Sequence, residues 1–179
     1  TLDNSYVESV WWLIRQLWDK GLLYEGHKVS PYCGRCGTAL SSHELGQPDV
    51  YRDIVDPSVY VRFPVVDRDV DLLVWTTTPW TLVSNTAVAV HPDVDYVAAR
   101  VTLEENSEVL VVAEALIGSL NGEVEILKTF KGSSLERTTY SRPLDFIDIP
   151  DSHFVVLATY VTTEDGTGLV HQAPAFGAD

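Results

Sequence analysis

Short strand patterns separated by turns fill the chain from residue 57 onward. Val59, Val61 and Phe63 occupy every second position, which is the period of a half-buried strand. Further strands are predicted at residues 72–75, 86–90, 96–101, 108–112, 123–130 and 154–159, with one short helix at 113–120. Because helices do not alternate regularly with these strands, the pattern favours a closed or partly closed β-barrel over a doubly wound sheet. The predicted fold class is mixed α/β and mainly β.

The N-terminal segment has a different pattern. Residues 5–20 are predicted to form a helix, with Ser5 and Glu8 in capping-box spacing and Gly21 at its end. Trp12 and Leu13 widen its apolar face, so we expect it to pack against another part of a longer parent protein, or else against this domain. Residues 1–49 are therefore predicted to be a connecting helix with a cysteine segment, and residues 50–179 the β domain.

Composition narrows the functional classes. A net charge of −14 disfavours a surface that attracts phosphates, so any RNA contact must be local or assisted by another domain. With 45% hydrophobic residues and no apolar run of about 20 residues, the chain is expected to be globular and without a membrane partner. The absence of methionine predicts a piece of a longer protein, and the lack of a signal peptide predicts a cytoplasmic one.

A pair of cysteines lies in the N-terminal segment. Cys33 and Cys36 flank a Gly-Arg dipeptide in a knuckle of the kind that offers two thiolates to a tetrahedral zinc ion. A structural zinc site needs four ligands, and only His27 and His43 lie nearby in sequence. Three interpretations stay open: a zinc half-site, a site completed by these histidines, and a pair of thiols without metal.

A cluster of hydroxyl side chains lies between two indoles at residues 75–85, Trp-Thr-Thr-Thr-Pro-Trp-Thr-Leu-Val-Ser-Asn. Strand alternation fails across the three consecutive threonines, and Pro79 cannot donate to a ladder, so a strand is predicted to end here. Hydroxyls at a strand end can orient a water or a sugar, whereas a general base or a metal requires other side chains. A threonine-rich turn with no binding role is the alternative.

The last segment joins a glycine-rich turn to a short apolar strand that ends in His171. Gly166 and Gly168 are weak evidence for phosphate binding, because no dinucleotide or P-loop fingerprint surrounds them. Small residues flank His171, so a ligand could reach the ring, although a lone histidine is more often structural.

Four segments together resemble the editing domain that is inserted in isoleucyl-tRNA synthetases: residues 75–85, 166–177, 30–37 and 56–61. The similarity covers nearly the whole chain. The Trp-Thr-Thr-Thr-Pro-Trp-Thr peptide is its most specific part, because the related valyl and leucyl enzymes carry an arginine in the Thr-Pro portion. The resemblance implies the β-barrel editing fold of the class I (Val/Ile/Leu) aminoacyl-tRNA synthetases, with an N-terminal helix.

The activity implied by this resemblance is hydrolysis of valine mis-esterified to isoleucine tRNA, with valyl-adenylate as a further substrate left open. A second, size-limited site is needed because one missing methylene lets the synthetic site distinguish valine from isoleucine only to a limited degree. Isoleucyl-tRNA synthetase is the usual example of this limit. Editing itself would need no cofactor. The implied partners are the 3′ end of isoleucine tRNA carrying valine and the remaining domains of the parent synthetase.

The resemblance also implies roles for individual residues. The catalytic set would be Thr76, Thr77, Thr78 and His171, with the threonines holding the ester and the histidine acting first as a gate against isoleucine and second as a base. The substrate-binding set would be Trp75, Trp80, Thr81, Asn85 and Asp179. The two tryptophans would shape the pocket walls, and Thr81 and Asn85 would fix the terminal adenosine or the water. Asp179 would replace an aspartate that the family places one residue later, to grip the α-amino group.

In relatives a second Cys-x-x-Cys follows the editing insertion, so Cys33 and Cys36 would complete a zinc site only in the full enzyme. The rival hypothesis is a non-catalytic zinc-ribbon and β-barrel module that binds tRNA or protein. The acidic charge and the single cysteine pair disfavour it.

Overall fold

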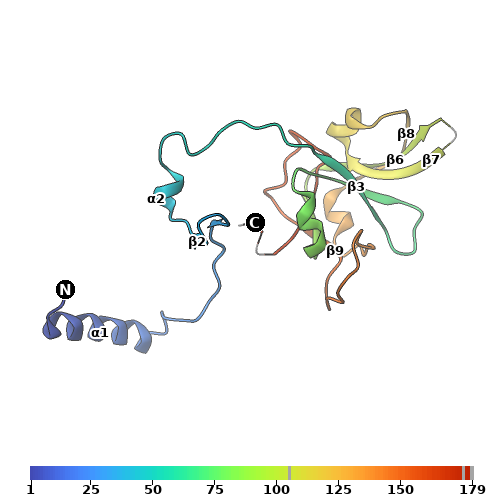
Figure 1. Ribbon diagram of the computed structural model, residues 1–179. Helices are drawn as coiled ribbons and strands as arrows, with labels where there is room; N and C mark the ends of the chain where they lie inside the picture. Colours follow the sequence, from blue (N-terminus) through green and yellow to red (C-terminus); the bar gives the residue numbers. More distant parts are fainter. Residues whose placement is uncertain (105, 175, 178–179) are drawn as a thin grey trace. The chain divides into compact units, whose positions relative to one another are not determined.

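The computed structural model describes residues 1–104, 106–174, 176 and 177 (Figure 1). The chain forms two compact units, Thr1–Val50 and Tyr51–Asp179. In the described part of the chain, no helix has both the length and the apolar character that crossing a membrane requires.

Helix α1 (Asn4–Asp19) is the main element of the first unit and confirms the predicted helix. It ends at Asp19, two residues before Gly21, whose φ of 67° is in the left-handed region, and the Leu22 N–H donates to the Leu17 carbonyl at 3.0 Å. None of its residues is buried, and the Trp11 and Trp12 side chains are 65% and 62% exposed.

The predicted capping box at Ser5 and Glu8 is wrong. The helix begins earlier, after Asp3, so Ser5 lies within its first turn, and Asp3 makes no side-chain cap hydrogen bond. A capping box is present instead at the start of the short helix α2 (Ser42–Leu45). There the Ser41 hydroxyl accepts from the Glu44 N–H at 3.3 Å, and the Glu44 carboxylate accepts from the Ser41 N–H at 2.7 Å.

The second unit contains two β-sheets. The larger has the strand order β3-β4-β7-β6-β8 and the smaller the order β10-β5-β9. The strands are β3 (Val59–Pro64), β4 (Asp71–Thr76), β5 (Ala87–Val90), β6 (Asp95–Leu103), β7 (Asn106–Ala113), β8 (Glu123–Lys131), β9 (Phe154–Leu157) and β10 (Leu169–Gln172). They confirm the predicted strands and the mainly β class. The helix predicted at 113–120 is a 3₁₀ helix, η2 (Glu114–Ser119), and two more 3₁₀ helices are η1 (Pro79–Ser84) and η3 (Gly132–Leu135).

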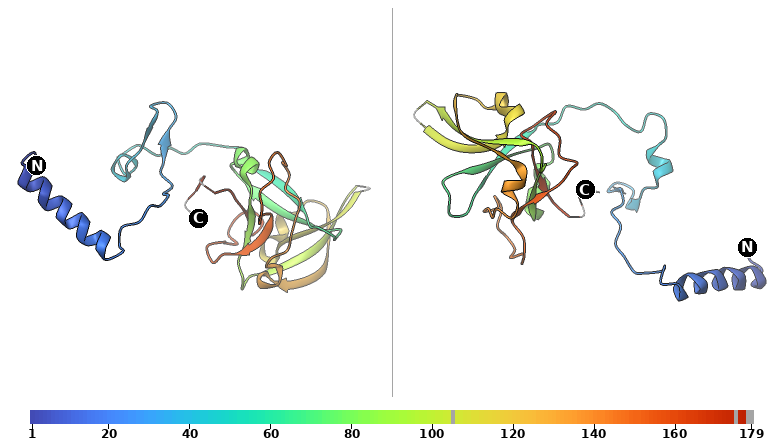
Figure 2. Two further views of the ribbon diagram at one scale, coloured as in Figure 1. Left: turned by 90° about the horizontal axis from the view of Figure 1, so that it is seen from below. Right: turned by 180° about the vertical axis from the view of Figure 1, so that it is seen from behind.

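Within the described residues, the hydrogen-bonded ladders join the strands into these two sheets. The two sheets enclose a common core, in agreement with the partly closed form of the predicted barrel, and both views in Figure 2 show their strands around one interior. Phe63, Leu72 and Val74 come from the larger sheet, and Val88 and Leu169 from the smaller. All five are at most 1% exposed.

Strand β4 is buried on both faces. Leu72 and Val74 face the common core, while Leu73 belongs to a second apolar cluster, against which Ile117 and Leu120 pack. Burial on both sides explains why Leu72, Leu73 and Val74 form an uninterrupted apolar run. It also fixes the strand that leads into the threonine cluster.

The glycine-rich turn before β10 permits close packing. Gly166 and Gly168 have φ values of 76° and 75°. A Cβ atom on Gly166 would lie 2.8 Å from Cε3 of Trp75, and one on Gly168 would lie 2.5 Å from Cβ of Ala113. The Ala113 N–H also donates to the Thr167 carbonyl at 2.8 Å. These contacts account for both glycines without a phosphate ligand.

A polar group of side chains lies in the core beside η1. The Tyr140 hydroxyl donates to Oδ1 of Asn85 at 2.7 Å, and Nδ2 of Asn85 donates to the Ala87 carbonyl at 2.9 Å. Asn85 is 0% exposed, and burial raises the pKa of Tyr140 above its ordinary value. The Asn85 carbonyl also contacts Nε2 of His153 at 3.1 Å, which connects the end of η1 to the start of β9.

Replacing Tyr140 by Phe is expected to lower the free energy of unfolding by about 1–3 kcal/mol, because Oδ1 of Asn85 would stay buried without its donor. Thermal and denaturant unfolding measure the change. The matched control is Tyr60→Phe at a side chain that is 50% exposed, where the change is expected to stay within about 0.5 kcal/mol. Equal changes in the two variants would contradict this account of the core.

Candidate functional site

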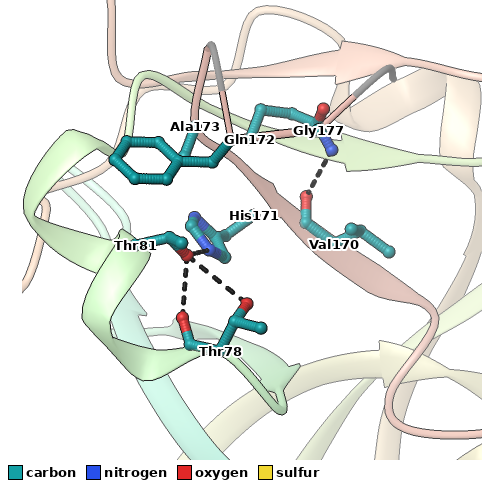
Figure 3. Close-up of a pocket in the computed structure, with 8 residues that line it drawn as sticks. Thr78, Thr81, Val170, His171, Gln172, Ala173 and Gly177 are labelled. Atoms are coloured by element: carbon teal, nitrogen blue, oxygen red, sulfur yellow. Dashed lines mark hydrogen bonds between the residues drawn. The ribbon is translucent and has the colours of Figure 1, made fainter. Parts of the chain in front are cut away.

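A pocket of about 180 Å³ lies between η1 and the end of the chain that follows β10 (Figure 3). Its walls come from two segments that are far apart in sequence. The residues that line it are Thr78, Thr81, Val170, His171, Gln172, Ala173, Phe176 and Gly177.

The threonine cluster forms the turn between β4 and η1. The Thr78 N–H donates to Oγ1 of Thr76 at 3.1 Å, so a side chain accepts this backbone donor where the strand ladder stops. Pro79 then opens η1, where its missing N–H leaves no hydrogen bond unmade. The predicted end of the strand at this cluster is confirmed.

A chain of polar contacts runs from this turn to β10. Oγ1 of Thr78 lies 3.3 Å from Oγ1 of Thr76 and 3.5 Å from Oγ1 of Thr81. The Thr81 hydroxyl donates to the Thr78 carbonyl at 2.8 Å and lies 2.7 Å from Nε2 of His171 (Figure 3). Thr76 and Thr81 are 7% and 6% exposed, whereas Thr78 is exposed. Thr78 therefore offers its hydroxyl to a ligand, and the other two hold the turn in place.

His171 is fixed by the register of the smaller sheet. It pairs with Val88 in the antiparallel β5/β10 ladder, and alternation along β10 directs Leu169 and His171 inward while Val170 is exposed. The side chain is 9% exposed, and burial lowers the pKa of His171 below its ordinary value, which favours the neutral ring.

Nδ1 of His171 is buried and has no hydrogen-bond partner among the described residues. A buried polar atom left without a partner costs about 1–3 kcal/mol. The ring borders the pocket, whereas Nδ1 itself has less than 1 Å² of accessible surface, so a bound group would have to uncover this atom to satisfy it. His171 is thus the titratable side chain that the described part of the pocket offers to a ligand.

The structure brings four of the predicted site residues together: Thr76, Thr78, Thr81 and His171. Thr77 is exposed and does not line the pocket, because the turn directs consecutive side chains to different sides. Asp179 lies outside the described residues.

Three other predicted residues lie away from the pocket. Trp75 packs against Gly166, and Trp80 is 64% exposed. Neither lines the pocket, although both were expected to form its walls. Asn85 is fully buried, hydrogen-bonds through both Oδ1 and Nδ2 of its amide in the core, and does not line the pocket.

Sequence reasoning missed the wall formed by the residues that follow His171. Gln172, Ala173, Phe176 and Gly177 line the pocket. Their position directly after the histidine, in a segment of small residues, was the available indication.

The cysteine pair lies on the turn between β1 (Tyr32–Cys33) and β2 (Thr38–Ala39). The Cys36 N–H donates to Sγ of Cys33 at 3.3 Å, and this hydrogen bond, followed by those from the Cys36 side chain and the Arg35 N–H, lowers the pKa of Cys33. No group of three or more His, Cys, Asp or Glu side chains suited to a metal occurs in the described residues. Neither His27 nor His43 therefore joins the two cysteines in a group of three within the described residues.

Comparison with known proteins agrees with this fold. The crystal structure of GlLeuRS-CP1 superposes with a TM-score of 0.54 at 22% sequence identity, over 65% of this chain and 54% of that one. At this identity the likeness concerns the fold alone.

The sequence relatives are considerably more similar. Proteins named isoleucine–tRNA ligase match 100% of this chain in Thermobifida fusca at 60% identity, in Streptomyces coelicolor at 54% and in Thermus thermophilus at 51%. The chain spans 17% of the length of each of these relatives. Residues 1–146 match the family described as tRNA synthetases class I (I, L, M and V), and the chain belongs to this family.

Proposed function

We propose that this chain is the editing segment of an isoleucine–tRNA ligase and that it hydrolyses valine esterified to isoleucine tRNA. The observation that carries the proposal is the pocket in which an exposed hydroxyl, Thr78, is linked through Thr81 to the buried ring of His171. The names of the sequence relatives and the fold shared with GlLeuRS-CP1 support it.

Selection in such a pocket would depend on size. Isoleucine is longer than valine by one methylene, and burial of that methylene is worth only about 0.8 kcal/mol. Apolar attraction would therefore favour isoleucine slightly and cannot select valine. A rigid wall that excludes the longer side chain discriminates more strongly, because overpacking costs about 1–3 kcal/mol. The His171 ring, fixed by a strand ladder and by Thr81, suits this role.

Hydrolysis requires a water to attack the ester carbonyl while the ribose oxygen leaves with a proton. No carboxylate lines the described part of the pocket. Water activation would then rest on positioning by Thr78, on the neighbouring ribose hydroxyl of the substrate and, secondarily, on His171. We propose no cofactor for this step.

The proposed partners are the 3′ end of isoleucine tRNA carrying valine and the remaining domains of the ligase, in the cytoplasm. A net charge of −14 makes tRNA binding by this chain alone unfavourable, so other domains would supply most of the phosphate contacts. A second cysteine pair from the longer protein would complete the zinc site at Cys33 and Cys36.

The direct test is deacylation of isoleucine tRNA carrying valine, isoleucine or threonine. The valyl ester is expected to be cleaved faster than the isoleucyl ester, and His171→Ala is expected to reduce this ratio about fourfold or more by opening the wall by at least one methylene. Equal rates for valine and isoleucine in the ligase would refute the proposal. A chain that binds stoichiometric zinc and cleaves no ester would favour the interaction module.

Replacing Thr78 by Phe is expected to abolish valyl-tRNA cleavage without unfolding the domain. The new ring would fill the pocket mouth, while the backbone N–H and carbonyl of residue 78 keep their partners. The matched control is Val83→Phe. Val83 lies on η1, is 45% exposed and does not line the pocket. Activity and thermal melting are measured together, and loss of activity in both variants would contradict the assignment.

The low pKa of His171 predicts a pH dependence of stability. The unfolded chain binds a proton near the ordinary histidine pKa of about 6.5, whereas the folded chain does not until lower pH, so stability falls as pH decreases below about 6.5. Melting temperatures of the parent chain and His171→Gln, measured across this range, should show a smaller slope for the variant. Parallel curves would contradict the effect of burial on this ring.

A further inference from the structure

The hydrogen bond between Thr81 and His171 determines where the ring carries its proton. Oγ1 of Thr81 lies 2.8 Å from the Thr78 carbonyl oxygen and 2.7 Å from Nε2 of His171. A threonine hydroxyl has one proton, and a carbonyl oxygen can only accept. When both contacts are hydrogen bonds, the Thr81 hydroxyl donates to Thr78 and accepts from the ring, which places the ring proton on Nε2.

The local fold reinforces this assignment. The acceptor is the backbone carbonyl of Thr78, the residue that directly precedes the 3₁₀ helix on which Thr81 lies, so the hydroxyl is held by a local contact that does not depend on a ligand. Thr81 is 6% exposed and His171 is 9% exposed, so water has little access to compete for either atom.

We propose that Thr81 is a positioning residue that holds His171 in the neutral form protonated on Nε2, so that Nδ1 can accept from a donor group of the bound ester or its water once ligand entry uncovers this atom. This inference rests on the proposed function for the identity of the ligand. It assigns Thr81 a role through the histidine, in place of direct contact with the adenosine.

The lack of a hydrogen-bond partner at Nδ1 of His171 determines which ligand groups suit the ring. Nδ1 is buried and lacks a partner among the described residues, and in this tautomer it can only accept. An ammonium, an amide N–H or a water O–H would complement it, whereas a carbonyl or carboxylate oxygen would be repelled. The ring would thus select the chemistry of the group beside it as well as limit its size.

Nitrogen NMR of the labelled 179-residue chain tests the assignment. The chain has five histidines, and the signals that disappear in His171→Gln identify the ring. In the parent chain, Nε2 of His171 is expected at the shift of a protonated nitrogen and Nδ1 at that of an unprotonated one. Thr81→Val, which keeps the branched shape but lacks the hydroxyl, should move both shifts toward a mixture of tautomers, and Thr81→Ser should restore them.

Deacylation of valyl-tRNA by the same variants completes the test. Thr81→Val is expected to lose about tenfold in rate, comparable to one hydrogen bond, and Thr81→Ser to recover most of it. A parent ring protonated on Nδ1, or ring shifts that Thr81→Val leaves unchanged, would overturn the inference. If Thr81→Val fails to fold by thermal melting, the spectrum of the parent chain still decides.

The two proposals fail separately. The nitrogen shifts could follow the expected tautomer pattern while the chain and the ligase cleave no valyl ester. That result would contradict the proposed function and leave the role of Thr81 intact. Cleavage of the valyl ester together with His171 ring shifts that Thr81→Val leaves unchanged would support the proposed function and contradict the role of Thr81.

Discussion

The antiparallel ladder between β5 and β10 is the constraint on which the site depends. It places His171 opposite Val88 and so brings the ring within 2.7 Å of Thr81, 90 positions earlier in the chain. Because strand side chains alternate, a register shift of one residue would turn the ring to the exposed face and put Val170 or Gln172 in its place. The pocket is therefore a product of sheet pairing more than of either loop that lines it.

Much of the fold follows from periodicity in the sequence. Alternating and continuous apolar runs located every strand of the two sheets, because burial on one or both faces determines which residues a strand can carry. The capping box was misplaced because the spacing of Ser5 and Glu8 recurs at Ser41 and Glu44, and only the backbone decides which serine precedes a helix. The sequence left open whether the strands close fully or in part, because short-range patterns contain no information about which strand edges pair.

The candidate site was predictable to a similar degree. Consecutive hydroxyls at a strand end and a histidine at another strand end marked these positions in the sequence, and Thr78, Thr81 and His171 do meet at one pocket. Nothing in the sequence indicated that Asn85 has a partner, Tyr140, 55 positions away in the core, because a polar residue in a polar cluster shows only its local neighbours. Nor did the sequence indicate that Trp75 packs against Gly166, because that contact joins two segments far apart in the chain.

The contact between Gly166 and Trp75 connects the glycine-rich turn to the strand that carries the threonine cluster. Trp75 directly precedes Thr76 on β4, so any added volume at Gly166 would press on the strand from which the hydroxyl turn emerges. The shape of the pocket is then sensitive to volume at a position that does not line it.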